Sequence, residues 1–184
     1  MVCMKQIAYL GVYELDNGCF AGGLLVCDHR GLPVDFRYVE PIKPTKLQRL
    51  IYGAALRRYL MVEAIGAGLL KECNSGYELA FVDDPLLLEL SAHCRAPVVR
   101  IEHTDHPPLK SRGDWEKADG IGITYQALNS GAPLSLHYKE DSGKIIEGLM
   151  DELTAIGETL DIAEPLERVK KAVVEVGGGA TGKI

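Results

Sequence analysis

Residues 6–40 read QIAYLGVYELDNGCFAGGLLVCDHRGLPVDFRYVE, and this stretch decides the fold class. Two segments rich in β-forming residues, 6–14 and 19–27, flank the turn signal DNG. After a second turn, apolar and polar residues alternate over 34–40, which is the period of a strand with one buried face. The stretch therefore predicts three antiparallel strands joined by tight turns, a meander.

A helical region follows the meander. Pro41 and Pro44 end the sheet segment, and Thr45 with Gln48 forms a capping box, in which each side chain accepts a free backbone N–H of the first turn. Apolar residues then recur at helical spacing to about Lys71. The predicted core stripe, with a break expected near Arg58, comprises Leu47, Leu50, Ile51, Ala54, Met61, Val62, Ile65 and Leu69.

Two buried strands and a short helix complete the first part of the chain. Residues 77–84, YELAFVDD, and 96–103, APVVRIEH, are predicted strands. Between them, Pro85 can open a short helix that runs to about His93, because its fixed φ suits a first helical turn.

The remaining residues predict a loop, a hairpin and two helices. Residues 104–120 have the composition of a long loop. The segments 121–128 and 133–139 predict a hairpin, with a helix over 121–128 as the alternative. One helix is expected from about Lys144, and Pro165 is well placed to open a second.

These elements predict a single α/β domain over 1–184. Its mixed sheet begins with the three-stranded antiparallel meander, helices pack on the sheet, and two helices end the chain. The expected parts are 1–103 (core sheet and helices), 104–143 (loop and hairpin), 144–176 (C-terminal helices) and 177–184 (tail).

Composition places the protein among cytoplasmic proteins without a membrane partner. Hydrophobic residues make up 47% of the chain, an ordinary share for a globular domain. No apolar run approaches the roughly 20 residues that cross a bilayer, and the first residues lack a signal-peptide pattern. The five cysteines are scattered without a C-x-x-C spacing, which predicts reduced thiols rather than a zinc site.

Charge is unevenly distributed in a chain with a net charge of −6. The segment 41–62 contains no acid, so it can attract an anionic partner, either another protein or a nucleic-acid backbone. Its basic residues are Lys43, Lys46, Arg49, Arg57 and Arg58.

The adjacent pair Asp83-Asp84 ends a predicted buried strand. Ligands of α/β proteins gather at the carboxyl ends of strands, so the two carboxylates could hold Mg²⁺ or Mn²⁺. Asp84 precedes Pro85, however, and is equally suited to cap the next helix. Both interpretations remain open.

The next strand ends in EHTDH, residues 102–106. Glu102, His103, Asp105 and His106 are all metal-ligand types, and in a sheet they could lie near Asp83. The alternative is an exposed polar loop.

The C-terminus contains Gly177-x4-Gly182-Lys183, a phosphate-binding loop pattern with Ile184 where Ser or Thr is needed. Such a loop requires a helix after it, and no residues remain for one. No nucleotide is expected at GGGATGKI, and the tail is expected to fray after about Val176.

The meander followed by helix, strand, helix and strand resembles the order of ribonuclease H-like proteins, endonuclease V in particular. In that family a strand ending in an acid, comparable to FVDD, helps bind the catalytic metals. The resemblance covers roughly 6–103 and implies that Asp83 or Asp84 is the matching ligand. The family also places an Asp in its first strand, whereas residues 6–14 contain no acid before Glu14.

Two functions follow from these observations. The preferred one is a non-catalytic binding or assembly protein without a cofactor, which uses the basic segment and Trp115, the only tryptophan, as contacts. The alternative is a phosphodiesterase or nuclease that depends on Mg²⁺ or Mn²⁺, with phosphate held by the basic segment. Its metal ligands and general base would come from Asp83, Asp84, His103, Asp105 and His106.

Overall fold

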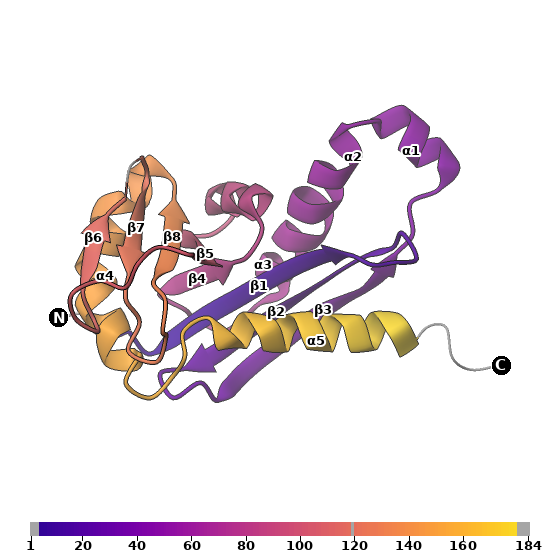
Figure 1. Ribbon diagram of the computed structural model, residues 1–184. Helices are drawn as coiled ribbons and strands as arrows, with labels where there is room; N and C mark the ends of the chain where they lie inside the picture. The colour runs from indigo at the N-terminus through magenta and orange to yellow at the C-terminus, as the bar shows by residue number, and fades with distance from the viewer. Residues whose placement is uncertain (1–3, 119, 180–184) are drawn as a thin grey trace.

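A mixed sheet forms the centre of the molecule (Figure 1). The computed structural model describes residues 4–118 and 120–179. The strand order is β3-β2-β1-β4-β5-β8-β7-β6. β4 is parallel to β1 and to β5, and the other neighbours are antiparallel. The strands are β1 (Gln6–Glu14), β2 (Phe20–Asp28), β3 (Pro33–Ile42), β4 (Leu79–Val82), β5 (Val98–His103), β6 (Trp115–Lys117), β7 (Gly122–Tyr125) and β8 (Leu134–Tyr138).

Helices cover both faces of this sheet. One buried cluster joins the sheet to α4 and α5, and a second joins the opposite face to the segments between β3 and β5. Within the described residues, no helix has the length and apolar character needed to cross a membrane. The helical segments are α1 (Lys46–Tyr52), α2 (Ala55–Arg58), the π-helical η1 (Tyr59–Gly66), α3 (Ala67–Glu72), the 3-10 helices η2 (Pro85–Ala92) and η3 (Glu140–Ser142), α4 (Gly143–Ile156) and α5 (Glu164–Gly179).

The predicted meander is confirmed as β1, β2 and β3. β1 and β2 pair antiparallel over their full length, from Gln6 opposite Asp28 to Glu14 opposite Phe20. β2 is buried from Phe20 to Cys27 because helices pack on both of its faces. Gly22 and Gly23 make this possible. A Cβ on Gly22 would lie 2.5 Å from Ile65 Cγ2 on one face, and a Cβ on Gly23 would lie 2.9 Å from Val173 Cγ2 on the other.

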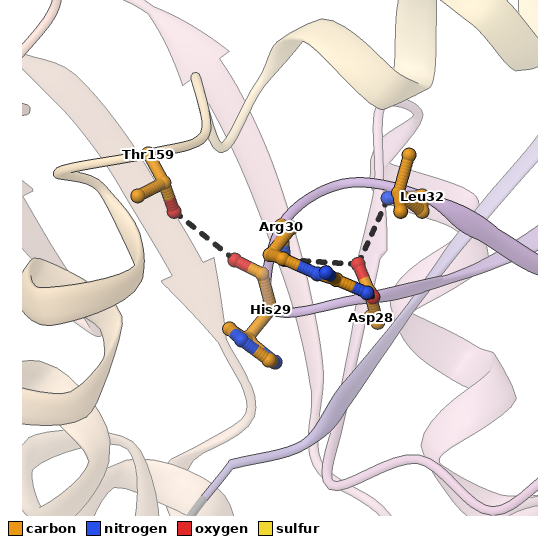
Figure 2. Close-up of polar contacts among 5 residues, drawn as sticks. All are labelled: Asp28, His29, Arg30, Leu32 and Thr159. Atoms are coloured by element: carbon orange, nitrogen blue, oxygen red, sulfur yellow. Dashed lines mark hydrogen bonds and ion pairs between the residues drawn. The ribbon is translucent and has the colours of Figure 1, made fainter.

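The turn between β2 and β3 is tied to the C-terminal half of the chain (Figure 2). Asp28 Oδ1 accepts the backbone N–H groups of Arg30 and Leu32, each at 2.9 Å, which closes the turn. The Thr159 hydroxyl then donates to the carbonyl of His29 at 3.3 Å. The connection between α4 and α5 is thereby anchored to the meander.

The first helix is capped as predicted but is not a core helix. Thr45 and Gln48 form both hydrogen bonds of the capping box. The break in the helical region lies at Gly53, whose φ of 50° ends α1, and not near Arg58, where it was expected. α1 projects away from the body of the molecule (Figure 1). The predicted burial of the first part of the stripe is wrong, because the apolar face of α1 is not covered by the described residues: Leu47, Leu50 and Ile51 are 64%, 72% and 71% exposed.

The second half of the fold follows the predicted order with two differences. The hairpin is confirmed as β7 and β8, which pair antiparallel, so the helical alternative over 121–128 is wrong. The expected loop contains the short strand β6, which pairs with β7. The two C-terminal helices are confirmed as α4 and α5.

The last helix continues past its expected end at Val176. α5 ends at Gly179, and Gly177 is buried where a Cβ would lie 2.4 Å from Leu15 Cδ1. Close packing against the β1–β2 turn therefore keeps the helix ordered beyond the last valine. The rest of the predicted tail, 180–184, lies outside the described residues.

Candidate functional site

Asp83 and Asp84 have different environments although they are adjacent in sequence. Asp84 caps η2, since its Oδ1 accepts the Leu86 N–H at 2.9 Å, and its Oδ2 accepts a hydrogen bond from Arg57 at 2.7 Å. Both oxygens of Asp84 are thus engaged. The capping interpretation holds for Asp84, which leaves Asp83 as the carboxylate with free coordination capacity.

Asp83 is held by a tyrosine on the neighbouring strand. The Tyr13 hydroxyl donates to Asp83 Oδ2 at 2.7 Å. Asp83 Oδ1 is buried and has no hydrogen-bond partner among the described residues. Burial raises the pKa of Asp83 above its usual range, and the Tyr13 hydrogen bond opposes that rise. The pKa of Tyr13 is raised by burial and by the negative charge of Asp83.

The first strand has no acid beside Asp83, and the Tyr13 hydroxyl occupies that place. β1 and β4 run parallel with Leu10 beside Val82, so Gly11 is the residue of β1 next to Asp83. A Cβ on Gly11 would lie 2.2 Å from the Tyr13 hydroxyl oxygen. The Tyr13 hydroxyl therefore fills the space that a side chain at position 11 would need.

An acidic cavity of about 270 Å³ opens beside Asp83. Glu102 and His103 contribute to it from the end of β5, and the start of α5 together with the turn before it supplies three further carboxylates. The acids that line the cavity are Asp83, Glu102, Asp161, Glu164 and Glu167. Three elements distant in sequence thus bring negative charge to the carboxyl ends of the parallel strands, the usual location of ligand sites in such sheets.

Sequence reasoning missed the acids that α5 and its preceding turn contribute. From sequence, Glu164 indicates only a negative charge that is favourable at the start of a helix. Glu164 and Glu167 are three residues apart, so they lie on one face of α5. That spacing was the only available signal, and it did not reveal that this face lies against Asp83.

The donor set of this cavity fits a hard divalent cation. Carboxylate oxygens are the ligands of Mg²⁺ and Mn²⁺, and Mg²⁺ is usually held by one or two carboxylates with water and substrate phosphate. Asp83 Oδ1, a buried oxygen without a partner among the described residues, is the kind of atom that a bound ion satisfies. No three Asp, Glu, His or Cys residues in the described part of the chain are arranged to hold a metal together. The cavity therefore fits a single ion that is bound by few protein ligands.

The 102–106 segment contributes to the site only through its first two residues. Glu102 and His103 line the cavity. Glu102 also forms an ion pair with Arg100 at 2.6 Å. Asp105 and His106 are exposed and are not among the lining residues.

The predicted basic residues lie at the end of the sheet where β1 ends, but most of them already have partners. Arg57 pairs with Asp84 at 2.7 Å, and Arg58 pairs with Glu89. Arg49 donates to the Gly18 carbonyl at 3.0 Å. Lys43 and Lys46 remain: neither forms an ion pair with any residue that the structure describes.

Trp115, the proposed aromatic contact, lies in β6 rather than in a loop. Its side chain is partly buried and packs against the main core cluster. The ring therefore has a role in packing β6 onto the domain.

Comparison with solved structures relates the whole chain to a group of nucleases. Human endonuclease V matches with a TM-score of 0.60 and 14% identity over 97% of this chain and 87% of that one. An endonuclease V from Ciona intestinalis, bound to DNA with an inosine followed by a ribo-adenosine, matches with a TM-score of 0.54 and 11% identity over 96% and 87%. No protein-family model matches the sequence, and the search of curated protein sequences found no match.

These matches overturn the preference for a non-catalytic binding protein without a cofactor. The matched proteins, which share the fold over nearly the whole chain, are named as endonucleases and not as binding or assembly proteins. At such low identity the likeness establishes architecture only. The mixed α/β chain has the ribonuclease H-like fold that endonuclease V also has.

Proposed function

We propose that this protein is a divalent-metal-dependent phosphodiesterase that cleaves nucleic acid, with Asp83 as its principal metal ligand. The fold supports the class of reaction, since the matched proteins are endonucleases. The position of the cavity supports the location, because it lies beside the carboxyl ends of β4 and β5.

One observation carries the proposal. Asp83 Oδ1 is a buried carboxylate oxygen that has no hydrogen-bond partner in the described residues, and its residue lines an acidic cavity. An unpaired charged group in such a place costs stability and usually marks a functional role. A bound cation offsets that cost and explains why several carboxylates gather at one cavity.

The residues around Asp83 have distinct roles in this proposal. Tyr13 occupies Oδ2 and leaves Oδ1 for the ion. The cavity acids Glu102, Glu164 and Glu167 would accept hydrogen bonds from water bound to such an ion. When bound, Mg²⁺ or Mn²⁺ supplies charge stabilisation for the phosphoryl oxygens and lowers the pKa of a water molecule.

His103 is the candidate general base. It lines the same cavity as Asp83, and it is exposed, so substrate and solvent can reach it. In the proposed reaction its imidazole accepts a proton from the water that attacks phosphorus. A neutral imidazole suits this task near neutral pH.

The substrate backbone is proposed to contact Lys43 and Lys46. Lys43 lies just before the projecting helix α1, and Lys46 is the first residue of that helix (Figure 1). Among the described residues they are the two cations of the basic segment with neither an ion pair nor a side-chain hydrogen bond, since Arg57 and Arg58 form ion pairs and Arg49 donates to the Gly18 carbonyl. Lysine side chains of this kind bind phosphate groups by charge, and such contacts weaken as salt rises.

Cleavage of end-labelled DNA and RNA oligonucleotides tests the proposal. The full chain is incubated with Mn²⁺, with Mg²⁺ or with EDTA, and products are resolved on a denaturing gel. We expect cleavage that requires the metal, is lost in Asp83→Asn and is reduced in His103→Ala. Asp151→Asn, the same change at an exposed position on α4, is the matched control and should cleave as the unchanged protein does. Full activity of Asp83→Asn, or activity in EDTA, would overturn the assignment.

A further inference from the structure

β3 is an edge strand whose free side is poorly protected. It is the first strand in the sheet order and, within residues 4–118 and 120–179, pairs only with β2. Proline and lysine usually block such edges against pairing with another chain. In β3 the prolines are Pro33 and Pro41, and the seven residues 34–40 between them contain neither proline nor lysine. The middle of the strand therefore keeps backbone groups available for another strand.

The face of β3 next to α5 is apolar and exposed. Val34, Phe36 and Tyr38 are 48%, 38% and 51% exposed, and the rings of Phe36 and Tyr38 stack with centroids 6.1 Å apart. An apolar strip along an unpaired strand is the surface that a partner strand covers.

The charged side chains on the opposite face of β3 favour a second copy of this chain as the partner. Asp35 and Arg37 flank Phe36 and form an ion pair with each other at 2.9 Å. When two copies of β3 pair antiparallel with Phe36 opposite Phe36, Asp35 of each copy lies opposite Arg37 of the other. Each of these two pairs then joins an acid to a base. On the apolar face, Val34 lies opposite Tyr38. If the pairing were centred on residue 35 or on residue 37 instead, Asp35 would lie opposite Asp35 of the other copy, or Arg37 opposite Arg37. Like charges would then face each other.

We propose that two copies of this chain associate through β3, in an antiparallel pairing centred on Phe36. The interaction joins the two sheets into one and covers the apolar strip on the α5 side. Its specificity comes from the pattern apolar–acid–apolar–base–apolar over residues 34–38, which is complementary to itself only in the antiparallel direction. The proposal concerns a surface separate from the Asp83 cavity and does not depend on the proposed reaction.

Sedimentation velocity of the full chain over about 1–100 µM protein is the first test. We expect a dimer whose fraction rises with concentration. Asp35→Arg alone places Arg opposite Arg, and Arg37→Asp alone places Asp opposite Asp, so each change should weaken dimerisation about tenfold or more. The double variant, with the two charges exchanged, should dimerise as the unchanged protein does.

A mixing experiment separates the contact between copies from the contact within one copy. Both single variants lose the Arg37–Asp35 pair of the same chain. When they are mixed, however, every Arg lies opposite an Asp of the other variant. We expect heterodimers to form from two variants that each dimerise only weakly alone. A mixture that stays monomeric, or an unchanged protein that is monomeric at every concentration, would overturn the proposal.

Cysteine cross-linking tests the register. Residues directly opposite each other in an antiparallel pair have Cα atoms about 4.5–5.5 Å apart, a distance that a disulfide can span. Phe36→Cys should therefore form a cross-linked dimer on oxidation, identified by mass spectrometry of the linked peptide. In the Tyr38→Cys variant the new thiol lies opposite residue 34 of the other copy, so the thiols of two copies should not form a disulfide. Equal cross-linking at the two positions contradicts the register.

Discussion

Replacing Tyr13 by Phe removes a single hydroxyl group from the contact with Asp83. The lost bond measures 2.7 Å between the Tyr13 hydroxyl and Asp83 Oδ2, and Asp83 Oδ1 already has no partner in the described residues. Both carboxylate oxygens would then be unpaired. A hydrogen bond to a charged group contributes about 1.5–3 kcal/mol, so the free energy of unfolding should fall by about that amount.

Thermal unfolding followed by circular dichroism measures this loss. For a chain of this length, 1 kcal/mol corresponds to about 2–4 °C in Tm, which predicts a fall of about 3–12 °C for Tyr13→Phe in EDTA at pH 7. Tyr38→Phe removes the hydroxyl of a side chain that is 51% exposed and keeps its apolar ring on β3; it is the matched control and should keep its Tm. In the Asp83→Asn background the effect of Tyr13→Phe should shrink to about 0.5–1.5 kcal/mol, the value of a bond between neutral groups. Equal Tm values for Tyr13→Phe and Tyr38→Phe would refute the coupling between Tyr13 and Asp83.

Three further predictions concern Asp83, Asp84 and Gly22. Because burial raises the pKa of Asp83, the folded state binds the proton of this carboxyl more tightly than the unfolded state does. The charge of Asp83 therefore lowers the free energy of unfolding at pH 7–8, and this loss disappears as the pH falls below about 4. Asp83→Asn should therefore raise Tm at pH 8 and leave it unchanged near pH 3, and a lower Tm at pH 8 would contradict this. Asp84→Ala removes the cap of η2 and should lower the free energy of unfolding in urea by about 0.5–2 kcal/mol, whereas Asp84→Asn keeps a capping side chain and should lose less. Gly22→Ala places a Cβ 2.5 Å from Ile65 Cγ2 and should cost about 1–3 kcal/mol, while Gly76→Ala, with no atom within 4 Å, should not.

The meander was predictable because its signals are local. The alternation of Val34, Phe36 and Tyr38 and the turn residues between the strands depend only on neighbours in sequence. The capping box of Thr45 is local too, and it formed as predicted.

Burial of the first helix was not predictable from its periodicity. Leu47, Leu50 and Ile51 have the spacing of a core stripe, yet all three are exposed. Periodicity shows that a helix has an apolar face, but whether that face is covered depends on where the helix docks. Gly53 turns the chain before α1 can lie on the sheet, and one glycine in a helical pattern does not reveal such a turn.

The site was predictable only for the residues at strand ends. Asp83, Glu102 and His103 follow from the rule that strand ends gather at one edge of the sheet. Glu164 and Glu167 are about eighty residues further along the chain than Asp83 and reach the cavity through the docking of α5 on β1 and β2. The hydrogen bond from Tyr13 to Asp83 could not be predicted from sequence either, because it depends on the parallel register of β1 and β4.

Binding of Mn²⁺ to the full chain tests the central claim, that Asp83 is the metal ligand of the acidic cavity. Electron paramagnetic resonance of free Mn²⁺ in a titration reports binding without any need for catalysis. We predict one Mn²⁺ site in the unchanged protein, binding at least about tenfold weaker in Asp83→Asn and unchanged binding in Asp151→Asn. Mn²⁺ binding of equal strength in Asp83→Asn and in the unchanged protein would contradict the account.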